Sequence, residues 1–181
     1  AASIGGTGVG IDVRDEAAIV RLVDDTQAAH GPIDLFVSNA GFVTAAGLED
    51  SNDAIQRMWE VHCMAHIYAA RAVLPSMIAR GEGYLLNTAS AAGLLTQIGS
   101  MAYSITKAAA VSLGEWLSVT HHHQGIRVSV LCPQAVATPL LRGREGKGAG
   151  VDGVMSVDTL VDAVIAGLDA ERFLILPHPQ V

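Results

Sequence analysis

Three side chains of this sequence form a set that can move a proton to or from an oxygen atom. Tyr103 and Lys107 are spaced so that, in a helix, they lie on the same face one turn apart. A lysine ammonium beside a phenol favours the ionised phenol, which makes the tyrosine a usable acid or base. Ser90 adds a short hydroxyl that can hydrogen-bond an oxygen on which negative charge develops. The three residue types fit the reduction of a carbonyl group, or the reverse reaction.

This pairing of tyrosine and lysine can also arise by accident. The chain has only two lysines and three tyrosines, but a short motif remains a hypothesis until its context supports it. The elements that would have to position these side chains therefore decide the interpretation.

Composition indicates one compact domain spanning residues 1–181. Half of the residues are hydrophobic and 16% are charged, which fits a sheet covered by helices on both faces. The net charge of −7 gives no basic surface for phosphate backbones, so no nucleic-acid partner is expected. Metabolite chemistry fits this charge better.

Other composition signals concern the membrane, the compartment and metals. No apolar run approaches the roughly 20 residues of a membrane-spanning helix, so no membrane association is expected. Cys63 and Cys132 lie in apolar stretches, which predicts that both are buried thiols. Free thiols in turn indicate a cytoplasmic protein. The consecutive His121, His122 and His123 point in different directions on a helix, so a solvated helix end is favoured and no metal site is expected.

Short β-branched runs alternate with longer helical stretches along the chain. This order predicts parallel strands joined by right-handed crossovers, an α/β fold with a three-layer doubly wound parallel sheet. The glycine-rich segment 142–153 is expected to be a loop near the site. The predicted strands are residues 9–13, 35–38, 84–88, 127–132 and 173–176, and the predicted helices are residues 16–29, 53–80, 100–122 and 157–169.

The residues that follow each strand are the candidate site, because ligands of an open parallel sheet bind beyond the carboxyl ends of its strands. Small residues there let a flat ring or a sugar approach the backbone, although Asn and Gly also form plain turns. Asp12 can accept a hydrogen bond from an adenine amine or simply end a strand. The residues in question are Asp12 and Val13, then Asn39, Ala40 and Gly41, then Ser90, then Pro133 through Thr138.

The glycines near the start do not form a phosphate cradle. Residues 5–10 read Gly-Gly-Thr-Gly-Val-Gly, which lacks the G-x-G-x-x-G spacing and leads into a predicted strand instead of a helix. A turn followed by a glycine-rich strand is the better reading. A pyrophosphate-binding turn is therefore expected to be missing from this sequence.

At this point the order and spacing of the motifs resemble the short-chain dehydrogenase/reductase family over essentially the whole chain. The resemblance rests on Asp12-Val13, Asn39-Ala40-Gly41, Ser90, Tyr103-x-x-x-Lys107, the stretch 125–128 that leads into a strand, and Pro133 through Thr138.

The resemblance implies a Rossmann-like fold and a nicotinamide cofactor, NAD or NADP. Tyr103 would be the general acid or base, Lys107 would also hold the nicotinamide ribose, and Ser90 would orient the substrate oxygen. The cofactor would be lined by Asn39, Ala40, Gly41, Pro133, Val136 and Thr138, and its adenine would meet Asp12 and Val13.

Three departures from the family pattern stand out. In the family the domain is built of two similar halves, which predicts about 50 further residues before Ala1. The N-terminal βαβ part is therefore expected to be missing from this sequence. The residue that selects between NAD and NADP would lie in that part, so the sequence does not indicate which cofactor is used. His62 stands where the family carries an asparagine that supports a proton-relaying water, so His62 either modifies that relay or packs and caps a backbone group. Gln134 stands where the family has a glycine.

Two functions follow as hypotheses. The first is an oxidoreductase that transfers hydride between the cofactor and a secondary alcohol or ketone. The alternative is a non-catalytic scaffold or regulatory protein with the same fold. The long predicted helices 53–80 and 100–122 are more apolar than one sheet face requires, and in this family such helices pair subunits, so a homodimer or homotetramer is expected.

Overall fold

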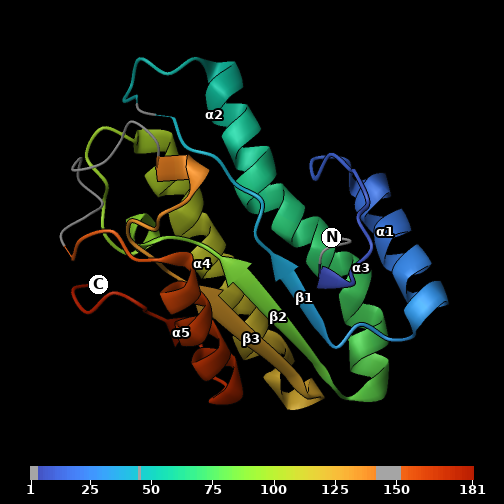
Figure 1. Ribbon diagram of the computed structural model, residues 1–181. Helices are drawn as coiled ribbons and strands as arrows, with labels where there is room; N and C mark the ends of the chain where they lie inside the picture. Colours follow the sequence, from blue (N-terminus) through green and yellow to red (C-terminus); the bar gives the residue numbers. More distant parts are fainter. Residues whose placement is uncertain (1–3, 45, 142–151) are drawn as a thin grey trace.

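A computed structural model describes residues 4–44, 46–141 and 152–181, and most of the predicted loop 142–153 lies outside these ranges. The described part contains four parallel strands in the order β1-β2-β3-β4 (Figure 1). The strands are β1 (Leu35–Ser38), β2 (Gly83–Thr88), β3 (Ile126–Leu131) and β4 (Leu174–Ile175). The predicted parallel sheet is thus confirmed.

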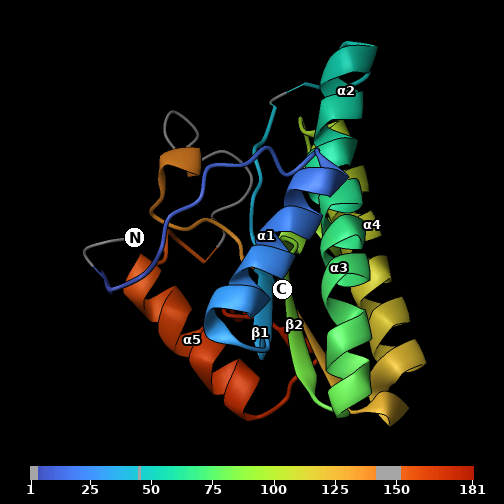
Figure 2. The same ribbon diagram turned by 90° about the vertical axis from the view of Figure 1, so that its right-hand side faces the viewer.

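The helices cover both faces of this sheet. On one face α3 packs on β1 and β2 and α4 packs on β2 and β3, whereas α5 packs on β3 and β4 from the other side (Figure 2). The fold is therefore the three-layer α/β arrangement that the sequence predicts. The helices are α1 (Glu16–His30), α2 (Asn52–Trp59), α3 (Ala65–Arg80), α4 (Met101–His121) and α5 (Val157–Asp169), with short helical turns η2 (Glu60–Met64), η3 (Ala91–Gly93), η4 (His122–Gln124) and η5 (Pro139–Leu141).

Local signals set the ends of these helices. The side chains of Asp15 and Ser156 accept hydrogen bonds from the first turns of α1 and α5, as N-cap residues do. Gly81 ends α3 with φ 72°, and Gly125 has φ 81° before β3. A Cβ on Gly125 would lie 1.8 Å from the Gly81 carbonyl oxygen, so only glycine fits where these two turns meet.

One predicted strand is absent. Residues 9–13 have no strand conformation, because a strand needs a hydrogen-bonded neighbour and no strand of the described part lies beside them. Ile11 and Val13 instead pack against Ile19 of α1 and against Ala65 and Ala69 of α3.

The predicted helix over residues 53–80 is also not one regular helix. It consists of α2 and α3 joined by the π-helical turn η2. Such turns insert an extra residue into a helix and recur at functional sites. In this chain the turn contains His62.

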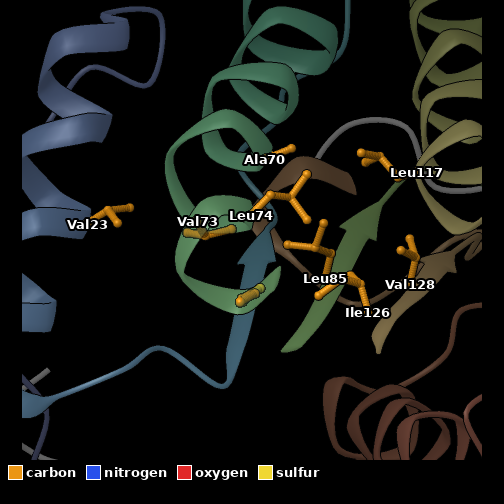
Figure 3. Packing of buried hydrophobic residues seen from close by; sticks show 9 residues of the cluster. Val23, Ala70, Val73, Leu74, Leu85, Leu117, Ile126 and Val128 are labelled. Carbon is orange, nitrogen blue, oxygen red and sulfur yellow. The ribbon is translucent and has the colours of Figure 1, made fainter. Parts of the chain in front are cut away.

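The largest core cluster joins the helices to the sheet. Val23 of α1 and Ala70, Val73 and Leu74 of α3 meet strand residues Leu85, Ile126 and Val128 and Leu117 of α4 (Figure 3). These side chains are all less than a tenth exposed. The cluster fixes α4, which carries Tyr103 and Lys107, against the sheet.

Candidate active site

A cavity of about 540 Å³ opens at the carboxyl edge of the sheet. It lies where the segments after β1, β2 and β3 converge on the N-terminal part of α4, as expected for a parallel sheet. Its size falls within the range of small-molecule sites. Of the predicted site residues, Asn39, Gly41, Ser90, Tyr103, Lys107, Pro133, Val136 and Thr138 line this cavity.

Tyr103 and Lys107 both point toward this cavity from α4. The Lys107 Nζ lies 5.8 Å from the centre of the Tyr103 ring, and both residues are buried. The ammonium donates a hydrogen bond to the Thr88 carbonyl at 2.7 Å. The predicted i, i+4 pairing therefore exists on the α4 face that meets the end of β2.

Burial lowers the pKa of Lys107 from 10.5 to about 8. The cause is loss of hydration around the ammonium, which the nearby Cys63 and Cys132 oppose only partly. The same burial raises the pKa of each of these thiols to about 11. Lys107 is thus still mainly protonated at neutral pH but loses its proton more readily than an exposed lysine.

Ser90 follows β2 in an extended conformation and caps η3. Its Oγ accepts a hydrogen bond from the Ala92 amide at 3.1 Å and donates to the Pro133 carbonyl at 3.4 Å. Close packing supports this turn, because a Cβ on Gly93 would lie 2.6 Å from the Lys107 carbonyl oxygen. The hydroxyl is therefore fixed in place on the same cavity wall as Tyr103.

His62 is fully buried behind the cavity instead of lining it. Its Nε2 accepts a hydrogen bond from the Phe42 amide at 3.2 Å, and its Nδ1 lies 2.9 Å from Thr106 Oγ1. Thr106 Oγ1 donates in turn to the Tyr103 carbonyl at 3.1 Å. A neutral imidazole has one donor and one acceptor, so these partners assign the proton to Nδ1.

Burial, with Lys107 as a smaller cause, lowers the pKa of His62 to about 3. The ring is neutral at ordinary pH and connects three segments: the turn η2, helix α4 and the segment after β1. Gly41 lets that segment lie close, since a Cβ there would be 3.3 Å from His62 Nε2 and 3.7 Å from Lys107 Nζ.

The residues predicted to meet an adenine lie elsewhere. The Asp12 carboxylate accepts hydrogen bonds from the Arg14 guanidinium, the shortest at 2.6 Å, and these bonds lower its pKa to about 2. Val13 packs on the α1–α3 cluster. Neither residue lines the cavity, nor does Ala40, and a role for them in cofactor binding stays a prediction.

Sequence reasoning missed several residues that shape the site. Thr106 could have been noticed, because it is a polar residue between Tyr103 and Lys107 on an apolar helix. Gln97 and Gln180 line the cavity but belong to none of the motifs. The apolar part of the wall comes largely from Leu95, Ile98, Leu140, Leu141 and Leu160.

Comparison with known proteins defines the class. The family model of the short chain dehydrogenases matches residues 4–147, most of the chain. The chain therefore belongs to the short-chain dehydrogenase family.

Individual relatives agree with this assignment. A 1-deoxy-11-beta-hydroxypentalenate dehydrogenase from Streptomyces exfoliatus is 33% identical over 177 residues, which are 95% of this chain and 64% of that relative. An inactive 2-(S)-hydroxypropyl-CoM dehydrogenase 2 from Xanthobacter autotrophicus is 36% identical over 155 residues, 84% of this chain and 67% of that relative. This chain thus spans about two thirds of the length of these relatives.

Solved structures show the same fold. The crystal structure of a gluconate 5-dehydrogenase from Burkholderia cenocepacia in complex with NADP and tartrate matches 92% of this chain and 71% of its own, with a TM-score of 0.82 and 26% identity. Within residues 4–44, 46–141 and 152–181, none of the helices has the length and apolar character that crossing a membrane requires.

The buried Lys107 predicts a pH-dependent difference in stability. Its pKa is about 8 in the folded protein and near 10.5 in the unfolded chain, so unfolding takes up a proton between these values and the folded state gains stability as the pH rises. Relative to Lys107→Met, which keeps an apolar stem, the wild type should gain on the order of 3 kcal/mol of unfolding free energy from about pH 8 to about pH 10.5. Urea denaturation of both proteins without cofactor measures this difference. A difference that does not change with pH would show that water reaches the ammonium.

Proposed function

We propose that the protein is a nicotinamide-dependent oxidoreductase that transfers hydride between NAD or NADP and a secondary alcohol or ketone. The observation that carries this proposal is the convergence of Ser90, Tyr103 and Lys107 on one cavity at the carboxyl edge of the sheet. Family membership and relatives named as dehydrogenases support it.

The cavity fits a nicotinamide. Small residues, Gly41 and Ala89, form part of its wall beside the Lys107 ammonium, and such a wall admits a flat ring close to the backbone. Asn39, Gly41, Pro133, Val136 and Thr138 would line the bound cofactor, with Ala40, Asp12 and Val13 contributing outside this cavity. When bound, the nicotinamide supplies the hydride to the carbonyl carbon or accepts it from the alcohol carbon.

The chain's own residues would handle the oxygen and its proton. As the carbonyl carbon gains hydride, negative charge develops on oxygen, and the Ser90 hydroxyl can turn from the Pro133 carbonyl to donate a hydrogen bond to it. Tyr103 gives its phenolic proton to that oxygen, which completes the alcohol and leaves a phenolate. The Lys107 ammonium stabilises this phenolate. In the oxidative direction Tyr103 removes the same proton.

The substrate should be largely apolar. Lys107 is the one ionisable side chain that can bear charge at neutral pH among the described residues that line the cavity, and leucine and isoleucine side chains form much of the remaining wall. Buried Cys63 and Cys132 are free thiols, which fits the cytoplasm that we propose as its compartment.

Tyr103→Phe tests the proposal directly. In the full-length protein this change should lower kcat by at least roughly 100-fold, because the proton donor is lost while the ring remains. Binding of reduced cofactor, followed by its fluorescence, should be retained. Tyr68→Phe on α3 is the matched control and should keep normal turnover. Substantial remaining activity in Tyr103→Phe would remove Tyr103 from the catalytic role.

The alternative is a non-catalytic protein with this fold. It is favoured by one observation, the 36% identity to a relative named as inactive. Assays of the wild-type protein with reduced cofactor and a broad panel of ketones separate the two proposals. Binding of the cofactor without its oxidation by any ketone of the panel would support the alternative.

We further propose that His62 acts as a positioning residue and does not carry protons. Both ring nitrogens are engaged within the protein, and a ring with a pKa of about 3 stays neutral where such an enzyme works. Through Phe42 and Thr106 it holds the segment after β1 against α4. The asparagine that the family carries at this position could make only part of these contacts.

His62→Asn separates positioning from proton transfer. If His62 only positions, the shape of the pH profile of kcat/KM should not change, although its height should fall. The wild type should also gain unfolding free energy from about pH 3 to 6.5 relative to His62→Asn, because the folded pKa lies below the unfolded value near 6.5. A profile that loses an ionisation near neutral pH in His62→Asn would instead show that the ring titrates during turnover.

We also propose that the protein forms a homodimer or homotetramer through α4. Ile105, Trp116 and Val119 are more than half exposed, and their spacing places them on one face of this helix. Exposed apolar faces of this kind usually mark an interface.

Val119→Glu should shift the protein toward monomer in analytical ultracentrifugation, because a buried carboxylate at an interface has no partner. Val161→Glu, the same change on the exposed side of α5, is the matched control and should leave the oligomer intact. A wild-type protein that sediments only as a monomer would contradict the proposal.

A further inference from the structure

The loop after β3 departs from the family pattern at Gln134, where relatives of this family carry a glycine. Among the described residues other than glycine, only Glu171 has a positive φ. The backbone at Gln134 thus has no need of glycine, and the side chain is available for another purpose.

His178 holds the backbone of this loop. It is 2% exposed and lies between Pro177 and Pro179, which stiffen the segment. The backbone amide of Gln134 donates to His178 Nδ1 at 3.1 Å. With Nδ1 as an acceptor, the ring carries its proton on Nε2. This Nε2 lies 3.3 Å from the Ala135 carbonyl oxygen. One buried ring thus satisfies two consecutive backbone groups.

The Gln134 side chain holds a second segment. Its Nε2 donates to Asp152 Oδ2 at 3.1 Å, and its Oε1 accepts from the Asp152 amide at 3.4 Å. The same Asp152 oxygen accepts a hydrogen bond from the backbone amide of Gln180 at 3.0 Å. Asp152 therefore connects the loop to the C-terminal segment that carries His178.

This clamp, formed by Gln134, Asp152 and His178, borders the cavity that contains Tyr103. Gln134, Val136 and Gln180 all line that cavity. Two backbone hydrogen bonds with Met155 also hold the loop. The Ala137 amide donates to the Met155 carbonyl at 2.9 Å, and the Met155 amide donates to the Ala135 carbonyl at 3.0 Å. The position of this cavity wall thus depends on contacts made outside the cavity.

We propose that Gln134, Asp152 and His178 are positioning residues that fix the cavity wall formed by residues 133–138 and hold Gln180 at the cavity as a specificity residue. The kinetic part of this inference rests on the proposed oxidoreductase function. The clamp itself is a property of the fold and can be measured without turnover.

An exchange of the two side chains provides the sharpest test. Gln134→Glu alone places two carboxylates against each other, whereas Gln134→Glu with Asp152→Asn restores a donor and an acceptor between the two side chains. In the full-length protein, the single change should raise the KM for a ketone substrate roughly tenfold, with kcat altered less, because the wall is displaced while Tyr103 is untouched. The double change should return KM to within about threefold of the wild type.

Asp162→Asn on α5, an exposed carboxylate, is the control and should leave KM unchanged. Wild-type KM values in Gln134→Glu, or a defect of equal size in the double variant, would overturn the proposal. His178→Phe should likewise raise KM, since both hydrogen bonds of the ring are lost.

A readout independent of activity separates the two proposals. Hydrogen exchange at the backbone amide of Gln134 should accelerate in Gln134→Glu and slow again in the double variant. This pattern in a protein that reduces no ketone would refute the proposed activity and support the clamp. Unchanged exchange in every variant would refute the clamp even if the enzyme is active.

Discussion

The site depends on an ammonium group placed where water does not solvate it well. Lys107 is 3% exposed and is held by one backbone carbonyl, that of Thr88. Burying a charge with so little compensation is costly, and the fold must enclose it from several sides. The core cluster beneath α4 provides the rigidity, and the turns at the strand ends provide the enclosure.

Glycine makes that enclosure possible at two close approaches to α4. Gly93 allows the turn after β2 to lie directly against the Lys107 backbone, and Gly114 lets the same helix rest on Val130, where a Cβ would be 2.3 Å from that side chain. The Gly114 contact brings α4 nearer to the sheet, and the Gly93 contact brings the turn η3 nearer to α4, than a larger residue permits. The distance between helix and sheet in turn decides how far Lys107 is removed from water.

The sequence predicts the regular parts of this fold and the centre of the candidate site, because those parts are encoded locally. Alternating apolar runs locate β1 to β4, and the spacing of Tyr103 and Lys107 places both on one helical face. Residues 9–13 were predicted wrongly, since pairing with a neighbour and not local pattern decides whether such a run becomes a strand. The roles of Thr106, Asp152 and His178 could not be predicted, because their contacts join segments far apart in the chain.

The π-helical turn between α2 and α3 has a consequence for how this chain can change. Its hydrogen bond from the Ala65 amide to the Glu60 carbonyl encloses one residue more than an ordinary helical turn. Deleting a single residue here would restore a regular helix with little rotation of α2 relative to α3, because the wide turn already absorbs the extra residue. The side chains of the turn itself, His62 among them, would change direction, so the length of this turn is constrained by the placement of His62 more than by the packing of α2.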